Sequence, residues 1–128
     1  MRSLETLALA AMAVASSWII PVGVSVAQDS EAGAQVFMRC AACHQVGASA
    51  QHSVGPQLSG VLSRSIASAP GYDYSTGLSS RAGQAWNDAA LAAYIADPTA
   101  FIGERSAMPA QRLRPNQVAN LIAFLRTQ

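Results

Sequence analysis

Two cysteines and a histidine stand close enough in this chain to take part in one piece of chemistry. Cys40 and Cys43 are three residues apart, and His44 follows the second cysteine directly. This C-x-x-C-H pattern is typical of a c-type haem attachment site, in which both thiols bond the vinyl groups of the porphyrin. The pattern therefore predicts one haem c per chain, covalently bound through Cys40 and Cys43, with His44 binding the iron from one face.

A Cys-x-x-Cys pair also occurs in thioredoxin-like redox sites and in zinc sites. A zinc site needs four ligands, but the chain has no third cysteine and only one further histidine, His52. A thioredoxin-like pair opens a helix after a buried strand, whereas the pattern before Cys40 is helical. Both alternatives stay open on the pattern alone, and both fit it less well than haem attachment does.

The first 27 residues have the layout of a secretory signal peptide. Arg2 precedes a long apolar run from Leu7 to Ile20, and the small residues of Ser25-Val26-Ala27 form a cleavage site. We expect residues 1–27 to be removed, which leaves one mature domain at 28–128. The alternative is a leader that is retained as a membrane anchor, because the apolar run is near the lower length for a spanning helix.

Composition limits what the mature chain can do. All eight basic residues of the sequence are arginines, and the formal net charge is +1. Nucleic-acid binding needs a strongly basic face, so no nucleic-acid partner is expected. A chain of this length buries little core of its own, and a large flat cofactor would supply that core.

Local signals predict three helices. Asp29 or Ser30 can cap the first helix, which delivers the cysteines to the haem, and Asn87 can cap the second. Pro98 ends the second helix, because proline disfavours a helical conformation in the residue before it. A short loop is expected from there to Met108, and Pro115 suits the first position of a C-terminal helix. Between the first two helices, residues 46–85 are rich in Gly, Ser and Pro and predict a long irregular loop around the cofactor.

The segments along the mature chain resemble the class I c-type cytochromes, the small monohaem group of mitochondria and bacteria. The resemblance covers nearly the whole of 28–128. It implies an all-α cytochrome c fold, with about three to five helices around one covalently attached haem and long irregular loops. The matching segments are Glu31–Cys40, Gly55–Arg64, Gly71–Ser75 before Trp86, Leu91–Pro98 and Leu121–Arg126.

Met108 is the candidate for the second iron ligand. The other mature methionine, Met38, lies two residues before Cys40, too close to reach the opposite haem face. A core methionine is the alternative reading of Met108. A soft thioether raises the reduction potential of the iron, and two protein ligands close it to substrates. The predicted metal ligands are therefore His44 and Met108.

The resemblance implies roles for five further cofactor-binding residues. The carbonyl of Pro56 is expected to accept from the second ring nitrogen of His44, and Tyr94 to donate to the methionine sulfur. Arg64, Tyr74 and Trp86 match donors to a haem propionate.

The resemblance implies an exported, periplasmic carrier of single electrons between protein donors and acceptors. Such a protein is not an enzyme and has no small-molecule substrate. Once the leader is cleaved, no membrane-spanning segment is expected. An alternative is a haem-bearing subunit of a periplasmic dehydrogenase complex. A second is a gas-binding or peroxidatic haem protein, which requires that Met108 does not bind. The chain departs from the mitochondrial pattern by lacking lysines altogether.

Overall fold

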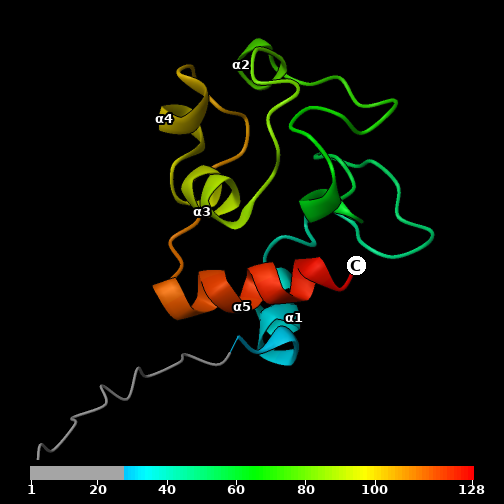
Figure 1. Ribbon diagram of the computed structural model, residues 1–128, viewed down its shortest axis with the longest axis vertical. Coiled ribbons are helices and arrows are strands. Elements are labelled where there is room, and N and C mark those ends of the chain that lie inside the picture. Colours follow the sequence, from blue (N-terminus) through cyan, green and yellow to red (C-terminus); the bar gives the residue numbers. More distant parts are fainter. Residues whose placement is uncertain (1–27) are drawn as a thin grey trace, which may run out of the picture.

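The computed structural model describes residues 28–128, so the predicted leader, residues 1–27, lies outside the described residues (Figure 1). No strand occurs within 28–128, where the only β pairing is an isolated bridge between Ser65 and Ala85. The prediction of an all-α fold with about three to five helices is confirmed. The elements are α1 (Ser30–Phe37), a 3-10 turn η1 (Val61–Ser63), α2 (Thr76–Ser79), α3 (Asp88–Ala96), α4 (Pro98–Ile102) and α5 (Pro115–Arg126).

Helix α1 begins where its sequence predicts. The Asp29 carboxylate accepts from the backbone N–H groups of Glu31 and Ala32 at 2.9 and 3.1 Å. These N–H groups have no partner within the helix, so the carboxylate satisfies them and also favours the positive end of the helix dipole. The cap therefore fixes the start of the helix that ends just before the cysteines.

Helices α1 and α5 join the two ends of the described chain, and their crossing is the most extensive contact between helices (Figure 1). The ring centroids of Phe37 and Phe124 lie 5.3 Å apart across it. At the start of α1, the Asp29 N–H donates to Asn120 Oδ1 at 3.0 Å. A long-range contact of this kind holds the segment with the cysteines against the terminal helix.

Gly33 makes the close approach of these helices possible. A Cβ at this position would lie 1.9 Å from the Asn120 carbonyl oxygen and 2.8 Å from the Cβ of Phe124. No L side chain fits in that space unless the backbones move apart. The spacing of α1 and α5 therefore depends on a residue without a side chain.

Helix α3 begins as predicted, but the loop predicted from Pro98 to Met108 is wrong over Pro98–Ile102, which forms α4. Proline ends α3 because it restricts Asp97, yet proline itself suits the first position of a new helix. Asp97 then caps α4, where its Oδ1 accepts from the Ala100 N–H at 3.0 Å.

Helix α5 begins at Pro115, as predicted, and the Gln117 Oε1 accepts from the Arg114 N–H at 3.0 Å. Its buried residues Leu121, Ile122 and Leu125 recur at helical spacing and face the core. Among residues 28–128, none of the helices combines the length and the apolar character that spanning a membrane requires.

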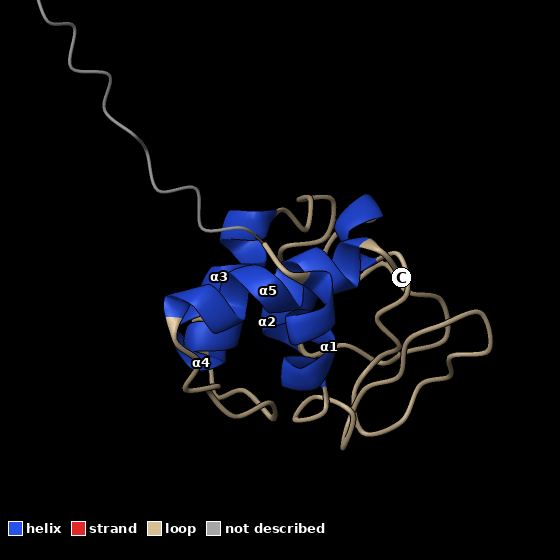
Figure 2. Cartoon of the chain, turned by 90° about the horizontal axis from the view of Figure 1, so that it is seen from below, coloured by secondary structure: helices blue, strands red, loops and turns tan. Residues whose placement is uncertain are grey.

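The chain between α1 and α3 is mostly loop, as predicted, and the loops gather on one side of the molecule (Figure 2). The short elements η1 and α2 interrupt it. His52 holds two of these loop segments together. Its Nδ1 accepts from the Gln57 N–H at 3.1 Å, and its Nε2 lies 2.8 Å from the Pro70 carbonyl oxygen. Because an N–H only donates and a carbonyl only accepts, His52 here is neutral with its hydrogen on Nε2.

We expect Gly33→Ala to destabilise the folded protein by about 1–3 kcal/mol, the typical cost of overpacking a tight contact. Alanine is also favoured over glycine inside a helix by about 1 kcal/mol. The net change in the free energy of unfolding is therefore the cost of separating α1 from α5 less this gain. Denaturant unfolding monitored by circular dichroism checks this. Gln35→Ala, on an exposed position of the same helix, is the control and should change stability little. A Gly33→Ala protein as stable as the wild type would contradict the role assigned to the crossing.

Candidate functional site

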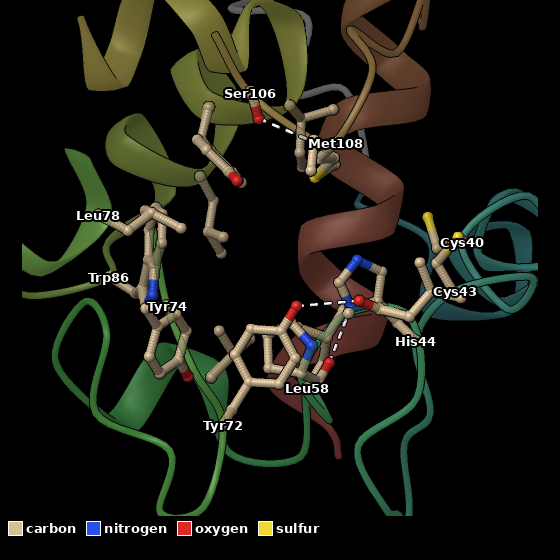
Figure 3. A pocket seen from close by; sticks show the side chains of 18 of the residues that line it. Cys40, Cys43, His44, Leu58, Tyr72, Tyr74, Leu78, Trp86, Ser106 and Met108 are labelled. Carbon is tan, nitrogen blue, oxygen red and sulfur yellow. Dashed lines mark hydrogen bonds between the residues drawn. The ribbon is translucent and has the colours of Figure 1, made fainter. Parts of the chain in front are cut away.

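A cavity of about 450 Å³ lies between the helices and the long loops (Figure 3). Its walls include residues from α1, the following turn, the loops on both sides of η1 and α2, and helices α3 and α5. Every residue that the sequence predicts for the cofactor site lines this one cavity. These residues are Cys40, Cys43, His44, Pro56, Arg64, Tyr74, Trp86, Tyr94 and Met108.

A turn that continues α1 presents the two thiols and the imidazole. The carbonyl of Cys40 accepts from the N–H groups of Cys43 at 3.0 Å and of His44 at 2.9 Å. Helical spacing of three and four residues puts these side chains on one side of the turn. Both cysteines are half-buried free thiols, and burial raises the pKa of Cys40 although the nearby Arg39 charge lowers it.

One nitrogen of His44 is committed to the protein and the other is left for a ligand. Its Nδ1 lies 2.7 Å from the carbonyl oxygen of Pro56. Since a carbonyl only accepts, Nδ1 carries a hydrogen, which leaves Nε2 as the nitrogen that can offer a lone pair to a ligand. Such a contact fixes the orientation of a ligating histidine and raises its basicity.

Gly55 lets the backbone lie against the imidazole. A Cβ at this position would be 2.3 Å from Cε1 of His44 and 2.7 Å from its Nδ1. The Gly55 N–H also donates to the Cys43 carbonyl at 2.8 Å. Gly55 therefore fixes the position of the His44 ring relative to the attachment turn.

The loop that carries Met108 is held by polar contacts on both sides of the methionine. The Met108 N–H donates to Ser106 Oγ at 3.1 Å, and the Ser106 N–H donates to Thr99 Oγ1 at 3.3 Å. Beyond Met108, the Gln111 N–H donates to the carbonyl of Ile95 at 2.8 Å. In Figure 3, Met108 and His44 reach the cavity from different walls.

Tyr94 lies on α3 beside this loop. Burial raises the pKa of its hydroxyl, while a hydrogen bond with the Ser106 side chain lowers it. The Ser106 side chain therefore lies near the Tyr94 hydroxyl, two residues before Met108, and the contact of Tyr94 with the methionine sulfur stays a prediction. Its ring packs 5.5 Å from the centroids of both Trp86 and Phe101, so the phenol is held within an aromatic cluster.

The three predicted propionate donors lie on the walls around this cluster. Arg64 donates through Nη2 to the carbonyl of Gln57, and the Tyr74 hydroxyl accepts from the Ala69 N–H at 3.1 Å. Trp86 is buried and its ring stacks on Phe101, 5.8 Å between centroids. A guanidinium has five donors, so Arg64 keeps capacity for a carboxylate.

The residues present fit a covalently bound haem. The cavity brings together two free thiols, an imidazole with one free nitrogen, a thioether and hydrogen-bond donors, and most of its remaining lining is apolar. The two alternatives fit poorly: within 28–128, no three His, Cys, Asp or Glu side chains group as a metal site would require. No strand precedes Cys40 in the described part, as a thioredoxin-like site needs.

Sequence reasoning missed three residues that shape this site. Gly55 was recognised only as part of a segment, and its contact with His44 has no local signal. Ser106 could have been noticed as a hydroxyl two residues before Met108. Glu104 accepts from the Gly77 N–H at 2.6 Å and so joins α2 to the methionine loop across 27 residues of sequence, which no local pattern indicates.

Comparison with known proteins identifies the family. The sequence profile described as Cytochrome c matches residues 30–128. The chain belongs to the cytochrome c family. Cytochrome c-554 of Methylosinus trichosporium is 37% identical over 127 residues, covering 98% of this chain and 92% of the relative. Cytochrome c2 of Rhodomicrobium vannielii is 36% identical over 102 residues, or 80% and 81% of the two chains.

Solved structures give the same answer for the fold of this cytochrome. Cytochrome c2 from Rhodospirillum centenum superposes with a TM-score of 0.69 at 29% identity, over 77% of this chain and 97% of the other. Cytochrome cH from Methylobacterium extorquens gives a TM-score of 0.67 at 33% identity, over 78% and 99%. The protein therefore binds haem c covalently, with Cys40 and Cys43 in the attachment motif, and is an electron carrier and not an enzyme.

We expect Gly55→Ala to displace the His44 ring, because the added methyl group would overlap it. The cost to stability should be about 1–3 kcal/mol, and the visible and near-infrared spectrum of the ferric protein should change as the imidazole tilts. Pro56→Ala keeps the carbonyl acceptor and is the matched control, so its spectrum should stay close to that of the wild type. An unchanged Gly55→Ala spectrum would show that the ring does not depend on this contact.

Proposed function

We propose that this cytochrome is an exported one-electron carrier whose haem iron is bound by His44 on one face and by Met108 on the other. Cys40 and Cys43 tether the haem, and Pro56 orients His44 through the 2.7 Å contact to Nδ1. The observation that carries the proposal is that a free imidazole nitrogen and a thioether reach one cavity from different walls (Figure 3).

A haem iron supplies a couple that passes between the ferrous and ferric states one electron at a time. The soft thioether of Met108 favours the ferrous state, and the neutral imidazole of His44 binds in both states. Ligation by the same two side chains in both states keeps the reorganisation on each transfer small. With His44 and Met108 both holding the iron, the protein would leave no position open to a substrate.

The hydrogen bonds of the methionine loop support the distal half of this proposal. Ser106 Oγ accepts from the Met108 N–H, and its side chain lies near the Tyr94 hydroxyl on α3. The hydroxyl of Tyr94 is protonated at neutral pH, as for any tyrosine with an ordinary or raised pKa, and can donate. We assign Tyr94 and Ser106 the task of holding Met108 toward the iron.

The walls also offer a place for a buried carboxylate. An unpaired buried carboxylate is costly, so it needs charge-assisted donors. We assign this role to Arg64, Tyr74 and Trp86, which line the same cavity. These donors would bind a haem propionate and so fix the orientation of the cofactor in the cavity.

We also propose export to the periplasm, based on the layout of the leader. The partners are then protein electron donors and acceptors in that compartment. The names of the relatives, cytochrome c2 and c-554, are consistent with an electron carrier of this kind.

Met108→Ala tests the distal ligand. The wild-type ferric protein should show the weak near-infrared charge-transfer band of sulfur–iron ligation, and the variant should lose it. The reduction potential should fall by more than about 60 mV, a tenfold shift of the redox equilibrium, because a harder ligand or water would replace the thioether. The ferrous variant should also bind carbon monoxide, which optical titration measures.

Met38→Leu is the matched control, because Met38 lies on the exposed side of the attachment turn. Its band and potential should match those of the wild type. Loss of the band in Met38→Leu and its retention in Met108→Ala would reverse the ligand assignment. Ready binding of carbon monoxide to the wild-type ferrous protein at neutral pH would favour a gas-binding protein.

The leader gives a separate test. Mass spectrometry of the protein isolated from the periplasm should find a mature N-terminus near Gln28, because small residues precede it at the cleavage site. An intact leader on a membrane-bound protein would instead make this an anchored cytochrome.

A further inference from the structure

Helix α2 contacts the segment that leads from α4 to Met108, although 27 residues of sequence separate the two partners (Figure 1). The Glu104 carboxylate accepts from the Gly77 N–H at 2.6 Å. Within 28–128, this is the only hydrogen bond between residues 76–81 and residues 98–114. The bond joins the neighbour of Leu78 to the loop of Met108, and both Leu78 and Met108 line the cavity.

The Gly77 end of this contact is tight and closed to water. A Cβ at this position would lie 2.8 Å from Glu104 Oε1 and 2.9 Å from the Cβ of Ile102. Gly77 is buried in the first turn of α2, where the helix itself offers no acceptor for an N–H. Without the Glu104 carboxylate, a buried donor would lack a partner, which is costly.

A second contact joins the other end of α2 to α4. The guanidinium of Arg81, just after the end of α2, lies over the Phe101 ring, 4.4 Å from its centroid. Phe101 in turn packs edge-on against Tyr94, with 5.5 Å between the ring centroids. Glu104 and Arg81 therefore attach both ends of α2 to the segment that leads into the methionine loop.

The other hydrogen bonds of the methionine loop lead to α3 and α4. The Ser106 N–H donates to Thr99 Oγ1 on α4, and the Gln111 N–H donates to the Ile95 carbonyl on α3. These bonds would let the loop move together with α3 and α4, away from α2. Glu104 is the side chain that opposes this movement with a hydrogen bond.

We propose that Glu104 is a positioning residue for the iron: its bond to the Gly77 N–H holds the methionine loop against α2 and so keeps Met108 at the cavity. The proposal rests on the ligation of the iron by Met108 that is proposed above. Glu104 is exposed and does not line the cavity, so it acts only through the loop. When the bond is lost, the loop leaves α2 more often, and the iron opens to other ligands.

Glu104→Ala in the holoprotein removes the acceptor. Carbon monoxide should bind the ferrous variant about fivefold faster or more, because it binds only while Met108 is away from the iron, and the lost bond is charge-assisted. The near-infrared band of the ferric variant should disappear at a lower urea concentration than that of the wild type, while far-ultraviolet circular dichroism still reports intact helices. Stopped-flow and equilibrium spectra measure both.

Two variants are the controls for Glu104→Ala. Glu104→Gln keeps a carbonyl oxygen that can accept from the Gly77 N–H, so its rate should stay within about twofold of the wild-type rate. Glu31→Ala removes the same charge from an exposed position of α1 and should leave the band and the rate unchanged. Equal acceleration by Glu31→Ala and Glu104→Ala would mean that lost charge acts and not the contact, and would overturn the proposal.

Gly77→Ala tests the contact from its other side. The added Cβ would overlap Glu104 Oε1, so carbon monoxide binding should accelerate, although alanine favours the helical conformation of α2. The double variant Gly77→Ala/Glu104→Ala should bind little faster than either single variant, because both changes break one contact. Accelerations that multiply would show independent effects and refute the pairing.

Hydrogen exchange at the Gly77 amide reads the bond without reference to the iron. Exchange measured by nuclear magnetic resonance should be slow in the wild type and in Glu104→Gln, and faster in Glu104→Ala. Unchanged exchange in Glu104→Ala would overturn the proposal.

The near-infrared band of the wild type separates this proposal from the one on which it rests. A wild-type ferric protein without the band would defeat ligation by Met108 and, with it, this role of Glu104. With the band present, equal rates of carbon monoxide binding in the wild type and Glu104→Ala would defeat the role of Glu104 alone.

Discussion

The constraint on which this structure depends is that residues 28–128 surround a cavity of about 450 Å³ that is lined by members of their own hydrophobic core, among them Phe37, Leu121 and Leu125. Helices α1 and α5 close one side through a crossing that only glycine at position 33 permits. Apart from α3 and the short α2, the other walls are loops, whose positions depend on single hydrogen bonds such as those of His52. A cofactor that fills the cavity would complete the packing of this small core, so we expect folding and haem attachment to be coupled.

Much of the fold could be predicted, because its signals are local. Asp29, Asn87 and Pro115 mark the starts of α1, α3 and α5, and each acts through neighbours within a few residues. Helices α2 and α4 span one turn each and lack a sustained apolar period, so nothing in the sequence distinguishes them from loops. Their caps at Ser75 and Asp97 are recognisable only once the course of the chain is known.

The same distinction applies to the site. The attachment turn is contiguous in sequence, and so its chemistry is legible there; Met108 follows by elimination among two methionines. The contacts that position these groups cannot be predicted from the sequence, because they join segments that are distant along the chain. The close approach of Gly55 to the His44 ring and the bond from Gly77 to Glu104 arise only when the loops are folded.

The residues that would bind the iron and the residues that hold them in position therefore lie in different segments of the chain. The proposed proximal ligand, His44, is held by nearby backbone: the Pro56 carbonyl accepts a hydrogen bond from its Nδ1–H, and Gly55 leaves room for its ring. The proposed distal ligand, Met108, lies on a loop held through side chains: Ser106 Oγ accepts from its N–H, and Thr99 Oγ1 accepts from the Ser106 N–H. Backbone contacts survive most substitutions, whereas side-chain contacts are lost with one. It follows that a substitution at Pro56 leaves the carbonyl acceptor of His44 in place, whereas a substitution at Ser106 removes the hydroxyl that accepts from the Met108 N–H. If the iron is bound as proposed, sequence variation in the methionine loop would therefore alter its ligation more readily than variation beside His44.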